Sequence, residues 1–587
     1  MKAIIFSDSL PKNKTKGNYI DFSGKQAKSN KNPEIEVIEL STLYNIFGQE
    51  WLEQFSVWLG QLNCEHAGLY WWAHTATAKN LLSTPLAQYY FQVRAVCEIA
   101  KQDNTSDLYV LGATPAQMIA IALLLPAGEF QFLGKSWRLR GWKGFVNSIK
   151  ALVKQWLQFG SVLVGFLMYR TPQNLGKPEL CLFTYMDGVR REGVDNYFGK
   201  LPALLRENHK FDSILYLAYV YRPYWKRLKG LKNESGGESY LALYGLLKIT
   251  DYTWSLWKTL GEWWSNSYGR KEISSCIDGY SAILKEVFVN ETGGYFHNLL
   301  VYKAVCRFVT RCTPKTIAYP FENKSLEKMI LLGVNKATQR IKMVGYQHTS
   351  VTPKHITLLF IPGEAALTPL PDKIITVGEI TKNYLETLGN YPPEIFIKGG
   401  ALRQVWNERL PRQHGKSICV LLALSSSKQE LIQSIEFFKE VMQHIPGLKL
   451  GIRPHINFSL SLLPRGLALW VSEHALDLSN TLLQDNLNWC TVTAYVSSTV
   501  ALEALMRGKP TVNFSIGDVV SSDPLVGRVP FHWQVYNPIE MAKILIQVNK
   551  MQMDDYEENS LQAVAYAKNY LSPINKMSLK NFSEVLQ

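Results

Sequence analysis

The chain lacks the cysteine spacing of a zinc site or of a disulfide framework. Its eight cysteines are scattered over 587 residues, and none of them forms a C-x-x-C pair. Structural zinc sites and disulfide-stabilised domains usually show such spacing, so neither is expected here. Free thiols of this kind suit the reducing cytoplasm. The first 17 residues hold only a short apolar run before charged residues begin, which predicts a β-strand rather than a signal peptide.

Long apolar segments and internal repeats are absent too. The longest apolar part, residues 156–169, is about 14 residues long, whereas a membrane-spanning helix needs roughly 20. The sequence shows no repeat of solenoid period and no low-complexity tract. A hydrophobic content of 47% excludes a mainly disordered chain, and 587 residues are too many for one core. We therefore expect a globular protein of two large domains.

Positive charge is abundant and unevenly distributed. The net charge is +14, and residues 131–170 contain seven Lys or Arg and no acid, with Trp and Phe interleaved. A second such cluster is YVYRPYWKRLKGLK, residues 219–232. Cations with aromatic rings suit the headgroup region of an anionic membrane. The same composition fits a solvated helix with a buried aromatic face, and it fits nucleic acid less well because no nucleic-acid-binding motif accompanies it.

Strand-like and helix-like segments alternate, which indicates an α/β protein with parallel sheets. In the first half, residues 108–114, 180–187 and 213–221 read as buried strands, and residues 235–310 as a Trp-rich helical insertion. In the second half the strands are expected in segments 341–350, 373–389, 396–403, 417–444, 448–455, 468–474 and 491–498. Parallel sheets bind ligands at the carboxyl ends of their strands, so we expect the ligand-binding residues in the loops there.

The segment 497–510, SSTVALEALMRGKP, follows a strand-like run and precedes another, TVNF. It predicts a hydroxyl-rich loop, a short helix and a tight turn. A helix N-terminus offers unpaired N–H groups to a phosphate, and Ser and Thr hydroxyls can donate to the same oxygens. An ordinary capped helix explains the pattern equally well. Similar loops hold Ser425 and Ser426, and Arg453 and His455, and if their strands are neighbours these loops converge with Ser497–Thr499.

The motif SSTxxLEALxxGKPxV, with KLGIRPH upstream, resembles the donor-site segment of GT-B glycosyltransferases of bacterial surface polysaccharides. The likeness is greatest to enzymes that use CMP-activated Kdo or nonulosonates, although Ile456 stands where that family usually has a second proline. Further segments match in order along the chain: 69–86, 184–208, 344–353, 369–379 and 399–403. The resemblance implies two Rossmann-like domains that face a cleft, with a helical insertion in the first.

The implied division of the chain has three parts. Residues 1–345 form an N-terminal acceptor domain with basic-aromatic helical insertions at 131–170 and 235–310. Residues 346–553 form the nucleotide-sugar donor domain, and residues 554–587 form helices that cross back to the N-terminal domain. The resemblance implies that the donor is bound by a set of side chains in the second domain: Ser425, Ser426, Arg453, His455, Ser497, Ser498, Thr499 and Glu503, the last of these toward the ribose.

The catalytic base is expected from the N-terminal domain. Asp187 is the first candidate because it ends an apolar strand, although an Asx-turn role explains this position equally well. His348 is the second candidate, at the domain junction, and His74 is a weaker one. The sequence contains no Asp-x-Asp motif, the usual metal-binding element of other glycosyltransferases, so we expect no metal and no cofactor. Inverting and retaining mechanisms both stay open.

The resulting expectation is a cytoplasmic enzyme, peripheral on the inner face of the cell membrane, that transfers a CMP-activated acidic sugar to a lipid-linked glycan. Its expected partners are the nucleotide sugar, the glycan and the anionic membrane surface, without nucleic acid. Three alternatives stay open: a GT-B transferase or an epimerase that uses a UDP-, GDP- or dTDP-sugar, a non-catalytic scaffold of a polysaccharide assembly complex and, more distantly, a basic nucleic-acid binder.

Overall fold

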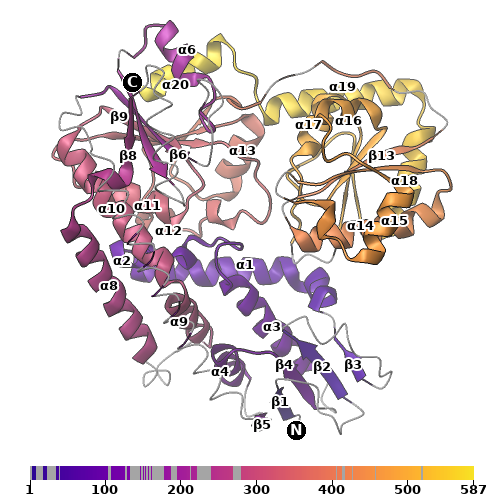
Figure 1. Cartoon of the computed structure of the whole chain (residues 1–587), viewed down its shortest axis with the longest axis horizontal. Helices are drawn as coiled ribbons and strands as arrows, with labels where there is room; N and C mark the ends of the chain where they lie inside the picture. The colour runs from indigo at the N-terminus through magenta and orange to yellow at the C-terminus, as the bar shows by residue number, and fades with distance from the viewer. Residues whose placement is uncertain are drawn as a thin grey trace.

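The structure is a computed structural model in which three parallel β-sheets follow one another along the chain (Figure 1). It describes residues 3–7, 17–22, 35–38, 40–102, 107–125, 129–132, 146, 150, 153, 157, 160, 177–186, 195–211, 213–220, 239–268, 279–404, 406, 408–412, 417–425, 427–455, 458–516 and 520–587. The expected basic-aromatic regions 131–170 and 219–232 therefore lie largely outside the described residues.

The first sheet has five strands and was not foreseen as a separate unit. Its order is β3 (Ile35–Val37), β2 (Gly17–Asp21), β4 (Leu108–Leu111), β1 (Ala3–Ser7) and β5 (Glu129–Phe132). Apolar strand residues pack against the helices α1 (Leu40–His66), α3 (Leu86–Gln102), α4 (Pro115–Leu124) and α9 (Ser281–Asn290). The core of this unit contains fully buried side chains, among them Trp51 and Val110, and removal of their apolar surface from water stabilises the unit.

The second sheet has seven strands. Its order is β12 (Phe396–Lys398), β11 (Lys373–Thr376), β10 (Lys342–Gln347), β9 (Thr316–Pro320), β6 (Leu180–Met186), β7 (Ile214–Val220) and β8 (Ser239–Ala242). Strands β6, β7 and β8 follow one another toward one edge of the sheet, and β9 to β12 follow one another toward the other edge. The topological switch point therefore lies between β6 and β9. Its helices are α6 (Leu201–Glu207), α8 (Ile249–Tyr268), α10 (Thr292–Arg311), α11 (Ser325–Val334) and α13 (Glu379–Leu388).

The third sheet has six strands and is likewise doubly wound. Its order is β15 (Ala475–Asp477), β14 (Lys449–Arg453), β13 (Cys419–Ala423), β16 (Val492–Tyr495), β17 (Thr511–Phe514) and β18 (His532–Val535). The switch point lies between β13 and β16, because the order runs outward from these strands. The helices of this unit are α14 (Lys428–His444), α15 (Arg465–His474), α16 (Leu483–Trp489), α17 (Val500–Met506) and α18 (Pro538–Lys550).

Two expectations from the sequence need correction. The expected domain boundary at 345/346 is wrong, because β11 pairs with β10 and β12 with β11 in the seven-stranded sheet, and the six-stranded sheet begins only at Cys419. The strand expected at 468–474 is the C-terminal part of helix α15. Its apolar residues Leu467, Ala468 and Val471 have helical spacing and pack on the core of the six-stranded sheet.

The C-terminal helices join the two larger units, as Figure 1 shows in yellow. Helix α19 (Met553–Tyr570) packs on α17 and on α13, and α20 (Lys576–Leu586) packs on β12 and β9 of the seven-stranded sheet. The approach is so close that a Cβ on Gly378 would lie 2.1 Å from the Tyr570 carbonyl oxygen. Two doubly wound sheets with C-terminal helices that return to the first of them constitute a GT-B architecture.

A buried ion pair fastens the five-stranded unit to the seven-stranded one. Lys79 Nζ lies 2.5 Å from Glu364 Oε2, and Asn63 Nδ2 in α1 donates to Glu364 Oε1 at 2.7 Å. Glu364 opens the short helix α12 (Glu364–Leu367), and all three side chains are almost fully buried. A buried charge is tolerated only when it is paired and hydrogen-bonded, as here. No helix among the described residues is long and apolar enough to span a bilayer.

Candidate functional site

Three neighbouring strands of the six-stranded sheet, β14, β13 and β16, end in polar loops on the same edge. Ser425 follows β13 and Ser497 follows β16, on either side of the switch point. Both of their hydroxyls bond to one carboxylate: Ser497 Oγ donates to Glu430 Oε2 at 2.7 Å, and Ser425 Oγ donates to the same oxygen. The switch point of a doubly wound sheet is where such folds bind ligands, so this constellation is the first candidate site.

Glu430 is the residue that the sequence reasoning missed. It lies in the first turn of α14, where Glu430 N donates to the hydroxyl of the N-cap residue Ser427 at 3.3 Å. The carboxylate reaches back and also accepts from Ser425 N at 3.1 Å. These contacts account for its burial at 6% exposure. The signal in the sequence was the Ser-x-x-Glu spacing of a capping box, which predicts a carboxylate folded back on the loop.

The Glu430 carboxylate changes what the two serines can offer a ligand. A hydroxyl has one proton, and Ser425 and Ser497 both direct it to Glu430. Their oxygens then present lone pairs to a ligand, which suits hydroxyl or amino groups better than phosphate oxygens. The expected contact of Ser497 with a phosphate therefore requires this hydroxyl to turn away from Glu430.

Ser498 and Thr499 precede helix α17. Ser498 is buried at 8% exposure and its Oγ accepts from Val500 N at 3.4 Å, whereas Thr499 is exposed and lies at the N-cap position. Glu503 lies in the first turn of the same helix. Burial raises the pKa of Glu503, against the attraction of Arg453 and Arg507. Arg453 and Glu503 thus lie close enough to interact electrostatically, as a shared donor site would need.

Arg453 is held by α16 and the loop before it. Its Nη1 donates to the Thr481 carbonyl oxygen at 2.8 Å and to Asn486 Oδ1 at 2.7 Å. These bonds fix the guanidinium at the end of β14, beside the Ser425 loop. His455 follows two residues later and accepts from Phe458 N through its carbonyl oxygen. The expected donor residue Ser426, and Ile456, lie outside the described residues.

The carboxyl edge of the seven-stranded sheet carries charged and titratable groups. His348 follows β10, and its Nε2 lies 3.6 Å from Glu322 Oε1 at the end of β9. Glu322 is also ion-paired with Lys324. The ring of Tyr197 contacts that of His348 edge-on at 4.9 Å, and the Arg403 guanidinium lies 5.8 Å from the Tyr197 ring. Burial, followed by the charges of Arg403 and Lys324, lowers the pKa of His348 to about 3.

Asp187, the first candidate base, lies outside the described residues. A nearby acid, Asp195, has a structural role. Its carboxylate accepts from Thr184 Oγ1 at 2.7 Å and from the backbone N–H groups of Tyr197 and Phe198 at 2.7 and 2.8 Å. Asp195 therefore fixes the turn that places Tyr197 against His348.

Helix α19 connects the two edges. Tyr570 OH donates to the Val351 carbonyl oxygen at 3.2 Å and accepts from Val351 N at 2.9 Å, three residues after His348. The same helix packs along α17, which begins directly after the loop with Ser497 and Ser498. The loops with His348 and Ser498 are therefore attached to one helix.

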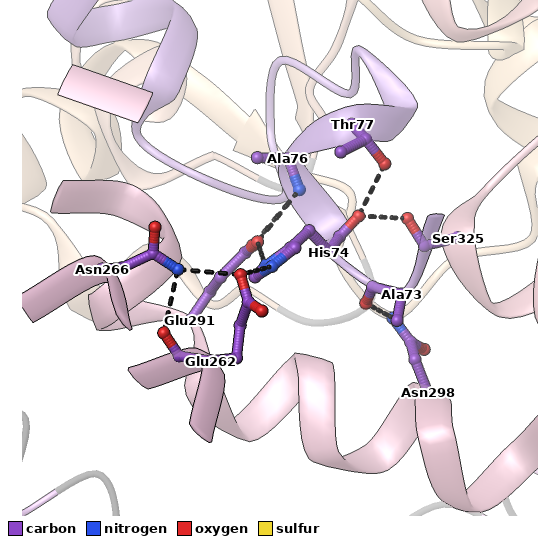
Figure 2. Close-up of polar contacts among 9 residues, drawn as sticks. All are labelled: Ala73, His74, Ala76, Thr77, Glu262, Asn266, Glu291, Asn298 and Ser325. Atoms are coloured by element: carbon purple, nitrogen blue, oxygen red, sulfur yellow. Dashed lines mark hydrogen bonds and ion pairs between the residues drawn. The ribbon is translucent and has the colours of Figure 1, made fainter. Parts of the chain in front are cut away.

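His74, the weaker candidate, belongs to a different part of the molecule (Figure 2). Its Nδ1 lies 3.1 Å from Glu291 Oε1 and its Nε2 3.2 Å from Glu262 Oε1, while its ring stacks on Phe288 at 3.6 Å. Only 2% of the side chain is exposed. A histidine enclosed in this way holds helices together and has no access to a substrate. Among the described residues, no cluster of His, Cys, Asp and Glu could hold a metal ion.

No protein-family model matches this chain, and no curated protein is significantly similar to it in sequence. Solved structures resemble it distantly. MurG of Acinetobacter baumannii has 8% identity and a TM-score of 0.40, covering 70% of this chain and 99% of its own. A glycosyltransferase of Rickettsia africae has 7% identity and a TM-score of 0.38, and the match covers 70% of this chain and 98% of that glycosyltransferase. The UDP-GlcNAc 2-epimerase of Neisseria meningitidis, bound to UDP-GlcNAc, has 11% identity and a TM-score of 0.38, and the match covers 69% of this chain and 99% of the epimerase.

Proposed function

We propose that this protein is a glycosyltransferase of surface polysaccharide biosynthesis. It transfers a sugar from a nucleotide donor, favoured as CMP-activated Kdo or a nonulosonate, to a lipid-linked glycan on the cytoplasmic face of the membrane. The observation that supports this most is the polar constellation at the switch point of the six-stranded sheet. Ser425, Glu430 and Ser497 meet there, next to Ser498 and to the Arg453 that ends β14.

Departure of the nucleotide needs fixed donors that are aimed at its phosphate. Ser498, Thr499 and Arg453 are the groups for this role, with His455 beside them. The oxygen lone pairs of Ser425 and Ser497 can instead accept hydrogen bonds from the hydroxyl groups of a ribose or from the amino group of a base. Glu503 completes the donor site on the ribose side. Donor binding in this scheme uses side chains alone and needs no metal ion.

The acceptor hydroxyl needs a base on the opposite edge, and Asp187 and His348 are the proposed groups. A general base works best when its pKa is near the working pH, and that of His348 is about 3 because the ring is buried and, to a lesser degree, because Arg403 and Lys324 are positively charged. An anionic group bound against Arg403 and Lys324 would neutralise those cations and raise the pKa of His348.

A thermal-shift panel of CMP, CDP, UDP, UMP, GDP and dTDP tests the donor site. A ligand that binds only the folded chain raises the apparent stability by mass action, which at a hundredfold excess over Kd is about 2.7 kcal/mol. We expect CMP to raise the melting temperature of the wild type and not that of Ser498→Ala. Ser472→Ala, an exposed serine on α15 of the same unit, is the matched control and should respond as the wild type does.

Other outcomes discriminate between the alternatives. Stabilisation by UDP, GDP or dTDP alone would support the nucleotide site and contradict the CMP-activated acidic sugar as the donor. If CMP still stabilises Ser498→Ala, the phosphate is not bound by this loop. A chain that responds to none of the nucleotides, with or without acceptor glycan, would contradict the transferase and favour a scaffold.

A further inference from the structure

Helix α8 (Ile249–Tyr268) exposes an apolar face. The exposed fractions of its large apolar side chains are 60% for Ile249, 76% for Trp257, 37% for Leu260 and 58% for Trp264. Separations of eight, three and four residues place these four on one side of the helix. Trp257 and Trp264 are the only tryptophans among the large hydrophobic side chains exposed in the described part of the chain. We call these four residues the α8 ridge.

The charged side chains of α8 turn toward the body of the protein. Asp251 accepts from Arg307 Nε at 3.1 Å and from Arg307 Nη2 at 3.0 Å. Glu262 bonds to His74, as Figure 2 shows, and Lys258 Nζ lies 4.9 Å from the centre of the Tyr70 ring. The exposed positions of α8 whose burial is described are Ile, Thr, Trp, Leu, Gly and Ser, without a charge. The exposed face of α8 therefore lacks the charged side chains that a surface helix usually presents to water.

We propose that the α8 ridge rests on an anionic lipid surface, with its indole rings at the headgroup level. Tryptophan is enriched at that depth of a bilayer because its ring has an apolar body and a polar N–H group. The inference rests on the membrane-surface part of the proposed function and does not depend on the donor nucleotide. It places the contact on described residues, separate from the basic-aromatic segments 131–170 and 219–232.

Charge complementarity selects an anionic membrane as the occupant. Lysines lie beside the ridge: Lys248 is exposed one residue before it, and Lys303 Nζ lies 4.0 Å from the Trp254 ring of the same helix. The two acids of α8, Asp251 and Glu262, are both paired with cationic partners. The net charge of +14 adds long-range attraction to anionic headgroups.

The shape of the ridge fits a plane. From Ile249 to Trp264 it extends about 22 Å along a single helix, at 1.5 Å per residue. Helix α8 lies on the outer flank of the molecule, at the left of Figure 1. A straight ridge at the periphery can touch a flat surface along its whole length. The contact lies in the surface plane, as for interfacial helices.

Co-sedimentation with vesicles tests the proposal. The full-length wild type is mixed with vesicles of phosphatidylcholine alone and with vesicles that contain phosphatidylglycerol as well. We expect binding to the anionic vesicles, and we expect Trp257→Ser/Trp264→Ser to lower the partition coefficient by about tenfold or more. Leu82→Ser/Leu561→Ser removes two side chains that are 92% and 58% exposed elsewhere, so this control should bind as the wild type does.

Two results would overturn the proposal. One is a tryptophan double variant that binds anionic vesicles as tightly as the wild type. The other is a wild-type dimer in sedimentation velocity that becomes monomeric in this variant, because the ridge would then face a second copy. The nucleotide thermal shifts, measured on the same variant, separate this test from the proposed function. Vesicle binding can be independent of the ridge while CMP still stabilises the chain, and the ridge can bind vesicles while CMP has no effect.

Discussion

His74 and His348 are both buried, and their pKa values shift in opposite directions. His74 lies between two carboxylates, Glu262 and Glu291. His348 has one carboxylate, Glu322, at 3.6 Å, two cations, Arg403 and Lys324, in its surroundings, and an aromatic ring edge-on to its own. Burial alone would lower both pKa values, but the hydrogen bonds and charges of the two glutamates raise the pKa of His74, whereas the two cations lower that of His348 further.

The difference separates a structural histidine from the one proposed to react. Both ring nitrogens of His74 face carboxylate oxygens, so the ring must carry two protons to donate to both, and it acts as a fixed cation between helices. His348 stays neutral, lies at a strand end, and has neighbours whose charge a bound anion would change. Burial and a shifted pKa therefore do not by themselves mark a functional residue.

The largest expected effect comes from His74→Ala. Removal of the imidazolium leaves Glu262 and Glu291 facing each other, with side-chain exposures of 33% and 10%. Loss of one partner from a buried ion pair costs about 3 kcal/mol of unfolding free energy. Urea unfolding measures this, and hydrogen exchange of the α8 amides shows whether that helix is released first.

His348→Ala is the matched control for this comparison. It removes a neutral ring and should cost clearly less stability than His74→Ala does. Equal losses in the two variants would mean that the charge on His74 contributes nothing.

The pH dependence of the two histidine variants should differ in sign. The folded pKa of His74 is raised, so its stabilisation is complete below the ordinary value of 6.5 and is lost as the pH rises through the folded pKa. The lowered pKa of Glu262 adds stability above 4.5, which is lost as the pH falls through its folded pKa. His348 behaves oppositely: between pH 6.5 and about 3 only the unfolded chain binds its proton, so acid destabilises the fold.

Unfolding free energies of the wild type, His74→Gln and His348→Gln from pH 5 to 9 test this. We expect the loss in His74→Gln to be greatest near pH 5 to 6 and to shrink toward pH 9. The unfolding free energy of His348→Gln should increase relative to that of the wild type as the pH falls. Parallel curves for all three proteins would show that neither histidine changes its protonation on folding.

Part of this arrangement could be read from the sequence. The α/β class and the loops after β13, β14 and β16 were predictable, because buried strands appear as apolar runs and their polar ends as short interruptions. The assignment of strands to sheets was not. Strands β11 and β12 have the same pattern as β13 and β14, and only their pairing shows that they belong to the seven-stranded sheet.

The roles of the histidines could not be read from the sequence either. The two glutamates that hold His74 are 188 and 217 residues away along the chain, so tertiary packing alone brings them together. Glu430 is different, since it is three residues from Ser427 and five from Ser425, and its capping-box spacing was visible. Contacts within one turn of helix can be predicted, whereas those that set the charge of a buried ring need the fold.

A smaller effect is expected from Arg403, whose charge is the second cause of the lowered pKa of His348. Arg403→Met keeps much of the side-chain length next to Tyr197 and removes the cation. The pKa of His348 should rise by about one unit, since a nearby like charge has an effect of this order. Carbon–proton NMR of the histidine rings follows the titration. Arg412→Met, a cation that bonds to the Met551 carbonyl oxygen, is the control and should leave the pKa of His348 unchanged.

The smallest effect concerns the outer contacts of His74. Asn266 Nδ2 donates to Glu262 Oε1 at 2.8 Å and to the Glu262 carbonyl oxygen at 3.0 Å, and so orients the carboxylate toward the imidazole. Asn266→Ala should lower the unfolding free energy by about 1 kcal/mol, the usual net value of a hydrogen bond. In a His74→Ala background the carboxylate has no imidazole to face, so the loss should fall by half or more. An unchanged loss in the double variant would show that Asn266 only holds the α8 backbone and does not support the charge pair.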